Sequence, residues 1–196
     1  MRKNLTFTSC FLLLFSLTVL STFAQNTSIG IKLGPAVTGF SDFERGRVKM
    51  GARVGGFLTY SISQKFGVGG EVNLVRKGAV SQNGEQITMD YVEVPLLAKF
   101  FFGEGGFRPK VFVGPYGAYL VQAQMDEEKQ DTYETNDYGV IIGAGFHQRL
   151  RKRKWFYFDI RYGYGLADIL PGTTYSNRDI SVSMGMSFPL DNWIEL

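Results

Sequence analysis

The sequence predicts an all-β fold, an eight-stranded antiparallel up-and-down transmembrane β-barrel. Apolar residues occupy every second position in eight separate segments, which is the pattern of β-strands with one apolar face. Short and long links alternate between these segments, as they do in outer-membrane barrels. Glycine and aromatic residues are abundant, with 24 glycines and 15% aromatics, whereas prolines number only 6. This combination favours a chain of many strands.

The first 24 residues predict a secretory signal peptide. Two basic residues at 2–3 precede an apolar run over 10–20, and small residues lead up to Ala24. The run is shorter than the ~20 residues of a transmembrane helix, although an uncleaved N-terminal anchor stays open as an alternative. Cys10 is the only cysteine and lies in this segment, so we expect no disulfide or thiolate in the mature chain. The predicted organisation is a signal peptide over 1–24, a barrel over 25–188 and a C-terminal tail over 189–196.

The eight predicted strands follow one another along the mature chain. The last is the clearest, because every even-numbered residue from Ile180 to Phe188 is apolar and every odd-numbered one is small or polar. Only the segment 109–122 is mixed on both faces. A tilted strand needs ~9–11 residues to cross a bilayer, and segments of about this length cover residues 27–34, 51–62, 66–77, 90–102, 109–122, 137–148, 155–166 and 180–188.

The links between these strands predict the orientation of the barrel. Short links lie at 63–65, 103–108 and 150–154, and long links lie at 35–50, 79–89, 123–136 and 167–178. Outer-membrane barrels have short periplasmic turns and long external loops. A chain that starts in the periplasm therefore places its long links outside the cell and both of its termini on the periplasmic side.

The two faces of the predicted strands differ in charge. One face is apolar and almost uncharged, whereas the other carries glycine and charged residues such as Lys32, Arg53 and Asp179. A soluble barrel with an apolar core is the alternative to a membrane barrel with a polar interior. The signal peptide favours the membrane barrel. So does an aromatic girdle that the topology predicts at the periplasmic end, formed by Phe100, Phe102, Phe107, Phe146, Phe156 and Phe188.

The charged face predicts an ionic network that plugs the barrel. Its candidate members are Glu71, Lys77, Glu93, Lys99, Asp159 and Arg161. Residues opposite each other on antiparallel strands share a constant sum of residue numbers, and Glu71 with Lys99 gives 170, as does Lys77 with Glu93. We therefore expect these two pairs to face each other across neighbouring strands, where opposite charges are favourable. Such a plug would make the barrel a closed scaffold and not a pore.

One strand carries a resemblance to a known family. The run over 91–100 reads YVEVPLLAKF, which resembles a strand of the PorT-like outer-membrane β-barrel family of the Bacteroidetes. The motifs Gly114-Pro115-Tyr116, Asp137-Tyr138-Gly139 and Arg161-Tyr162 fit its other strands. The resemblance covers most of 25–188 and implies an eight-stranded barrel in the outer membrane of a Gram-negative bacterium. The namesake of the family takes part in type IX secretion, but the resemblance does not imply one activity for all members.

The sequence offers little for catalysis or for binding cofactors and metals. The one histidine, His147, falls on the predicted inner face at the periplasmic end, where a lumen residue is expected and not a general base. The acidic residues over 126–128 make the third long link a candidate for Ca²⁺ or a cationic ligand, with a solvated loop as the alternative. We therefore predict no catalytic residue, no cofactor and no metal site.

Two classes of function remain open on the sequence. The first is a non-enzymatic barrel that serves as a membrane scaffold, a surface-binding protein or an accessory to a secretion system. The second is a small barrel enzyme that acts on lipids or peptides at its outer rim. The expected partners are outer-membrane lipid and other envelope proteins. The basic run 149–154 is expected to be a charged periplasmic turn, with contact to inner-leaflet phosphates as the alternative, and nucleic acid is not an expected partner.

Overall fold

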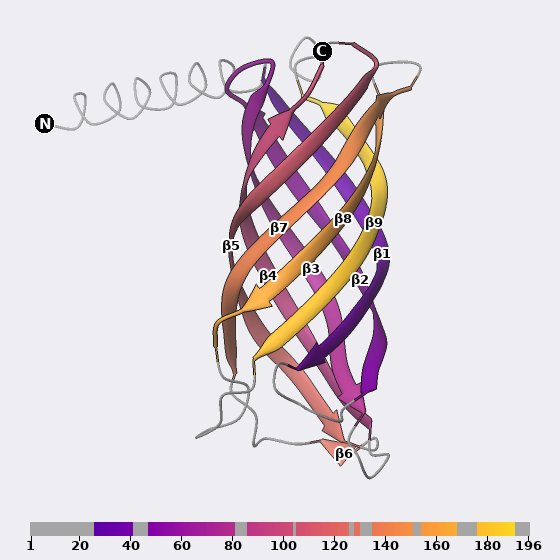
Figure 1. The fold of residues 1–196 in the computed structure, drawn as a ribbon, viewed down its shortest axis with the longest axis vertical. Coiled ribbons are helices and arrows are strands. Elements are labelled where there is room, and N and C mark those ends of the chain that lie inside the picture. Colours follow the sequence, from indigo (N-terminus) through magenta and orange to yellow (C-terminus); the bar gives the residue numbers. More distant parts are fainter. Residues whose placement is uncertain are drawn as a thin grey trace, which may run out of the picture.

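A computed structural model gives the architecture of the chain. It describes residues 26–40, 47–80, 86–103, 105–125, 128–129, 135–150, 154–167 and 176–190. These residues form the strands β1 (Thr27–Phe40), β2 (Arg47–Ser61), β3 (Phe66–Val80), β4 (Gln86–Phe101), β5 (Phe107–Met125), β6 (Glu128–Lys129), β7 (Asn136–Arg149), β8 (Trp155–Gly165) and β9 (Asn177–Pro189). Figure 1 shows the long strands tilted around a common axis.

The eight long strands close into an antiparallel barrel, as predicted. The hydrogen-bonded order is β4-β3-β2-β1-β9-β8-β7-β5, and a further pairing between β4 and β5 joins the two ends of this series. The two-residue strand β6 pairs only with the end of β5. Closure leaves none of the eight strands with a free edge. In the part of the chain that the structure describes, no helix is long and apolar enough to cross a membrane.

The strands extend further at the long-link end than the sequence predicted. β1 continues to Phe40, β5 continues to Met125 and β9 begins at Asn177, so parts of the predicted long links are strand. Register shifts occur between Val48 and Arg53 on β2 and opposite Asp90 on β4. Each shift inserts one extra residue into one strand of the pair and interrupts the alternation of side chains there.

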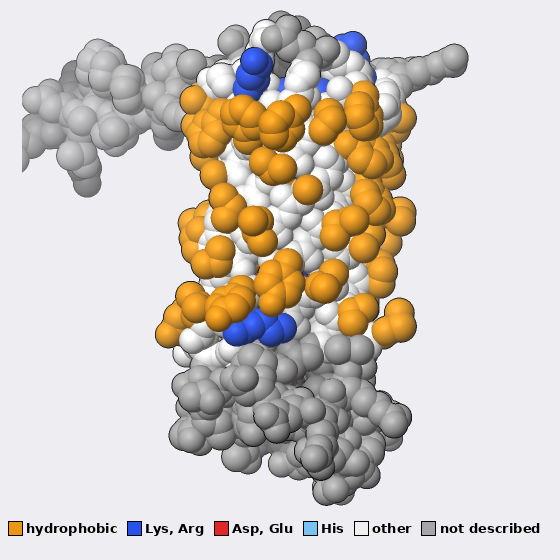
Figure 2. Space-filling model, viewed as in Figure 1, with side chains coloured by type: hydrophobic (Ala, Val, Ile, Leu, Met, Phe, Trp, Pro, Cys, Tyr) orange, Lys and Arg blue, Asp and Glu red, His pale blue; other side chains and the backbone are white. Residues whose placement is uncertain are grey.

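The apolar face of the barrel points outward and the charged face points inward. Ile31 is 67% exposed whereas its neighbour Lys32 is 2% exposed, and Met184 is 45% exposed beside a fully buried Ser183. Figure 2 shows apolar side chains as a band around the wall, with Lys and Arg side chains at its two ends. This arrangement is the inverse of a soluble barrel. It is the arrangement that a hydrocarbon surrounding requires.

Aromatic rings gather at the end that holds the short links. The rings of Phe100 and Phe102 lie 5.1 Å apart, and Phe146 lies 5.3 Å from Phe107 and 5.8 Å from Phe158. These phenylalanines lie close to the short links at 62–65, 102–106 and 150–154. Four of these rings, Phe100, Phe102, Phe107 and Phe146, belong to the girdle that the sequence predicts for the periplasmic end.

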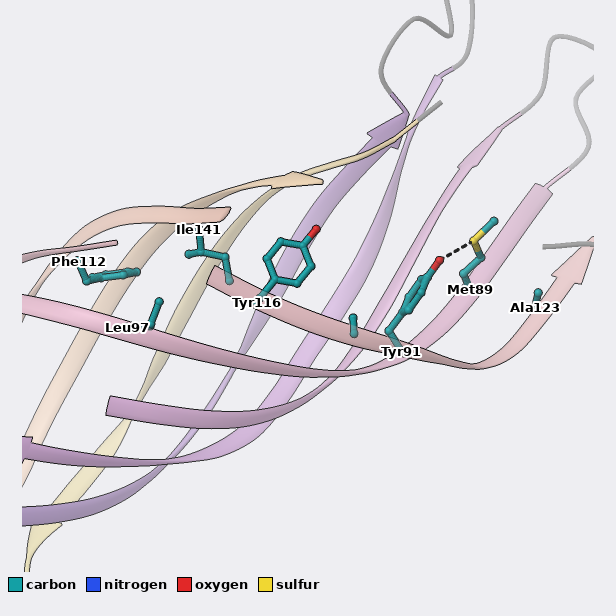
Figure 3. Close-up of a cluster of buried hydrophobic side chains, with 8 residues drawn as sticks. Met89, Tyr91, Leu97, Phe112, Tyr116, Ala123 and Ile141 are labelled. Carbon is teal, nitrogen blue, oxygen red and sulfur yellow. Dashed lines mark hydrogen bonds between the residues drawn. The ribbon is translucent and has the colours of Figure 1, made fainter. Parts of the chain in front are cut away.

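The interior of the barrel is apolar along one wall. Strands β4, β5 and β7 contribute a cluster of buried side chains, comprising Met89, Tyr91, Leu97, Phe112, Tyr116, Ala118, Ala123 and Ile141. Figure 3 shows these side chains projecting from the strands, with the Tyr91 hydroxyl hydrogen-bonded to the Met89 sulfur at 3.2 Å. The sequence predicts glycine and charged residues on the inner face, and this apolar cluster lies beside them. The mixed pattern over 109–122 arises because the strand β5 packs apolar residues on both of its faces.

Candidate functional site in the barrel interior

Every one of the eight barrel strands places at least one charged side chain in the interior. All are between 0% and 4% exposed. They are Lys32 on β1, Arg53 on β2, Glu71 and Lys77 on β3, Glu93 and Lys99 on β4, Lys110 on β5, Asp137 on β7, Asp159 and Arg161 on β8, and Asp179 on β9. These eleven residues, six cationic and five anionic, are called the interior network below. Its charges nearly cancel, as a site withdrawn from water requires.

The part of the network nearest the long links centres on Arg53 and Lys77. The guanidinium of Arg53 contacts the carboxylate of Glu93, and its Nη2 lies 3.1 Å from Asp179 Oδ2. The ammonium of Lys77 lies 3.3 Å from Asp137 Oδ2, 3.6 Å from Glu93 Oε2 and 3.8 Å from Asp179 Oδ1. Two cations on neighbouring strands thus hold three carboxylates from three other strands.

The remaining ion pairs lie closer to the short links. Glu71 accepts hydrogen bonds from Lys32 and from Arg161, whose Nη1 lies 2.9 Å from Glu71 Oε2. Lys110 Nζ lies 2.9 Å from Asp159 Oδ1 and 3.0 Å from Nε2 of His147. Most of these contacts join strands that are not neighbours in the sheet. They therefore cross the lumen and do not run along its wall.

Aromatic rings of the apolar wall face the cations of the network. Lys77 Nζ lies 5.3 Å from the ring centroid of Tyr91 and 5.1 Å from that of Tyr116. The guanidinium of Arg161 lies 5.4 Å from the ring centroid of Phe112. A cation is attracted to the electron-rich face of such a ring. The apolar wall and the ionic pairs therefore fill the barrel together.

Glycines make room for this network. A Cβ at position 163 would lie 2.3 Å from Asp179 Oδ1, and one at position 145 would lie 2.3 Å from Asp159 Oδ1. A separation that short is far inside van der Waals contact, so either side chain would have to move. At these two positions glycine leaves room for a carboxylate of the network, whereas at other inward glycines, such as Gly34 and Gly114, an added Cβ would meet the backbone carbonyl of the adjacent strand.

The structure corrects the predicted register of β3 and β4. Paired residues sum to 166 and not to 170, so that Lys99 faces Gly67, Glu93 faces Asn73 and Lys77 faces Met89. The shift of four residues is even, and it therefore leaves every side chain on its predicted face. The long side chains of the lumen reach several residues along and across the barrel. Direct opposition on neighbouring strands is not needed for them to pair, so it does not set the register.

The six predicted network residues all lie in the interior, but only one of the two predicted pairs is in contact. Lys77 and Glu93 are in contact, as described above. Glu71 is paired with Lys32 and Arg161, while Lys99 Nζ donates a hydrogen bond to Thr59 Oγ1 at 2.8 Å. Asp159 and Arg161 take separate partners. Sequence reasoning left five members out of the network, namely Lys32, Arg53, Lys110, Asp137 and Asp179, although their parity placed them on the inner face.

Among the described residues, no group of three or more His, Cys, Asp or Glu side chains lies close enough to hold a metal ion. His147 lies on the inner face near the short links, as expected, and packs against Phe101 and Tyr157 with ring centroids 5.4 Å and 5.8 Å away. Of the predicted acidic loop over 123–136, residues 126–127 and 130–134 lie outside the described residues.

Comparisons with known proteins agree with this architecture. The model of the outer membrane protein beta-barrel domain matches residues 23–170. No curated protein matches the chain in sequence. The crystal structure of neisserial surface protein A is similar, with a TM-score of 0.61 at 11% identity over 84% of this chain and 97% of that one. OprG from Pseudomonas aeruginosa has a TM-score of 0.55 at 16% identity over 84% of this chain and 96% of its own.

A further solved barrel, the N-terminal β-barrel domain of Pseudomonas aeruginosa OprF, has a TM-score of 0.50 at 15% identity, over 84% of this chain and 98% of that domain. At identities this low the likeness concerns the fold alone. The matched family and the outward apolar face together place the protein in the outer membrane of a Gram-negative bacterium. The chain belongs to the outer membrane protein beta-barrel domain family.

Proposed function

We propose that the protein is a non-enzymatic scaffold of the outer membrane, closed by its own interior. The observation that carries this proposal is the interior network, to which all eight barrel strands contribute. An eight-stranded barrel has an interior just wide enough for side chains to fill. Here Arg53 and Arg161 are among the largest fully buried side chains, and both contact carboxylates on strands that are not their neighbours. Such cross-links serve rigidity and closure better than transport.

Single-channel recording tests the closure directly. The purified barrel is inserted into a planar lipid bilayer, and its conductance is compared with that of an open porin added under the same salt. We expect no steady conductance from the barrel, because ion pairs and aromatic rings occupy the path along its axis. A stable, ohmic current that scales with the number of inserted barrels would contradict the proposal.

A scaffold of this kind would act through the surfaces that it exposes on either side of the membrane. We infer that the chain is exported by a signal peptide cleaved after Ala24, and that it serves as a surface-binding protein or a secretion accessory. The likeness of the run over 91–100 to the PorT-like family supports the accessory role. Crosslinking in intact cells followed by purification from outer membranes and mass spectrometry tests it. Recovery of a stoichiometric envelope partner supports an accessory, whereas recovery of the barrel alone at every crosslinker length opposes it.

The alternative of a barrel enzyme at the outer rim has less support. A hydrolase of lipids or peptides needs an activated nucleophile beside a general base. The one histidine, His147, lies near the short links and contacts a lysine ammonium. Incubation of the folded protein with outer-membrane lipids, followed by mass spectrometry of the lipids, separates the two classes. Time-dependent release of fatty acid that scales with protein concentration would favour the enzyme.

A further inference from the structure

The outer wall of the barrel carries an apolar groove at membrane depth. One part of it has a volume of about 640 Å³ and is lined by residues that include Ile29, Leu58, Gly70 and Phe188. A second part of about 520 Å³ adjoins it at Leu58 and Gly70 and continues towards Leu96. The groove exists because Gly56 and Gly70 occupy outward positions where their strands otherwise carry large apolar side chains.

The groove follows a row of paired residues from the periplasmic rim into the hydrocarbon. Ile29 pairs with Phe188 and with Leu58, Leu58 pairs with Gly70, and Gly70 pairs with Leu96. Counted from the end of its strand at the short links, each successive position lies one residue further into the strand. The positions are Phe188 (one from the end of β9), Ile29 (two from the start of β1), Leu58 (three from the end of β2), Gly70 (four from the start of β3) and Leu96 (five from the end of β4). Each step adds about 3.3 Å along a strand.

A cation stands where the groove meets the rim. The ammonium of Lys154 lies 5.7 Å from the ring centroid of Phe188, the residue that lines the shallow end of the groove. Lys154 itself is exposed, and it ends the basic run that begins at Arg149. The groove therefore presents a positive charge at the headgroup level, and below it a lining that is apolar except for Glu71, whose side chain is buried in the barrel interior.

We propose that this groove binds a phospholipid of the periplasmic leaflet, with one acyl chain along the row and the phosphate beside Lys154. A hollow on a membrane-facing wall loses dispersion contacts unless something fills it. An occupant must be apolar along its length, flexible enough to follow an oblique row and anionic at the rim. A phospholipid meets all three requirements. A rigid helix or a second copy of this barrel does not follow such a row and brings no anion to its end.

Filling the groove from the protein side tests the proposal. In Gly70→Leu the new Cβ meets only Leu96 Cδ2 at 3.7 Å, and in Gly56→Leu it meets only the Gly30 carbonyl at 3.6 Å. Both contacts are ordinary, so either leucine should fold and lie in the groove. The matched control is Gly117→Leu, an outward glycine of β5 outside the groove whose Cβ would meet nothing within 4 Å. Heat-modifiable gel mobility checks that each variant is folded.

Native mass spectrometry of barrels reconstituted with palmitoyl-oleoyl phosphatidylglycerol gives the readout. We expect the parent and Gly117→Leu to retain one lipid, and the two groove variants to lose it by about tenfold in the ratio of bound to free protein. Lys154→Gln should lower lipid retention roughly fivefold, because one basic residue near an anionic membrane surface contributes about 1 kcal/mol of binding free energy. The control for Lys154→Gln is Arg149→Gln. Arg149 stacks on Trp155, which does not line the groove, so its replacement should change lipid retention little.

Three results would overturn the proposal. Equal retention in the parent and in both groove variants would show that no lipid occupies the groove. Equal loss in Gly117→Leu would show a general effect of leucine on the wall. A dimer peak in the parent that disappears in Gly70→Leu would place a second copy of the chain there instead of a lipid.

Discussion

The replacement Arg53→Met removes the guanidinium that joins β2 to β4 and β9. Glu93 loses its closest cation, and Asp179 loses a partner at 3.1 Å. Breaking a buried pair from one side costs about 3–5 kcal/mol, because a charge is left in the interior without compensation. Lys77 remains within 3.6 Å of Glu93 and 3.8 Å of Asp179. We therefore expect a loss near the lower limit, about 3 kcal/mol in the free energy of unfolding.

The free energy is measured by urea unfolding of the protein folded into lipid vesicles, followed by tryptophan fluorescence. The matched control is Arg76→Met, since Arg76 Nε lies 2.7 Å from Asp90 Oδ1 and Nη2 lies 2.8 Å from Oδ2. This pair has good geometry, but its side chains are 60% and 34% exposed. Its loss should cost only about 0.2–1 kcal/mol. Equal losses in the two variants would refute the reasoning, because burial would then not decide the energy.

A double variant separates charge from packing. If an uncompensated carboxylate causes the loss in Arg53→Met, the further change Glu93→Met should restore part of the stability, since apolar residues often replace buried ion pairs at little cost. If the double variant is no more stable than the single one, an uncompensated carboxylate at Glu93 is not the cause of the loss.

Three further experiments test the faces, the packing and the export of the chain. Met184→Arg places a charge on the lipid-facing side and should lower the free energy of unfolding by about 2–4 kcal/mol near mid-depth. The effect of Ser183→Arg should depend on the packing of the lumen around it. A negligible effect of Met184→Arg on unfolding in lipid vesicles would contradict the face assignment. Gly163→Ala forces the Asp179 carboxylate to move and should cost about 1–3 kcal/mol, measured by the same unfolding assay, while Gly117→Ala should leave the urea midpoint unchanged. N-terminal sequencing of the protein from outer membranes should begin at Gln25, and a start at Met1 would show an uncleaved anchor.

The fold could be predicted because the bilayer imposes a period of two on the sequence. Positions such as Ile31 and Met184 must be apolar, and Lys32 and Ser183 must not face lipid, so the faces can be read without coordinates. The strand ends could not be read in this way. In β1 the alternation of buried and exposed side chains continues to Val37 and Thr38, but Gly34 and Pro35 are residue types that often mark the end of a strand, so the sequence predicts a link there.

The pairs of the interior network could not be predicted for a different reason. A sum rule for opposite residues finds only contacts between neighbouring strands, whereas Arg53 reaches Asp179 and Arg161 reaches Glu71 across the lumen. Those contacts depend on the curvature of the closed wall and on the glycines that admit long side chains. Parity fixes which charges face inward, and closure then brings them together whichever even register the strands adopt. A register shift of four residues thus changes the residue opposite Lys99 on the neighbouring strand. It still leaves the lysine in an interior whose positive and negative charges nearly balance. The composition of the inner face is therefore a stronger predictor of a closed barrel than any single pair of charges.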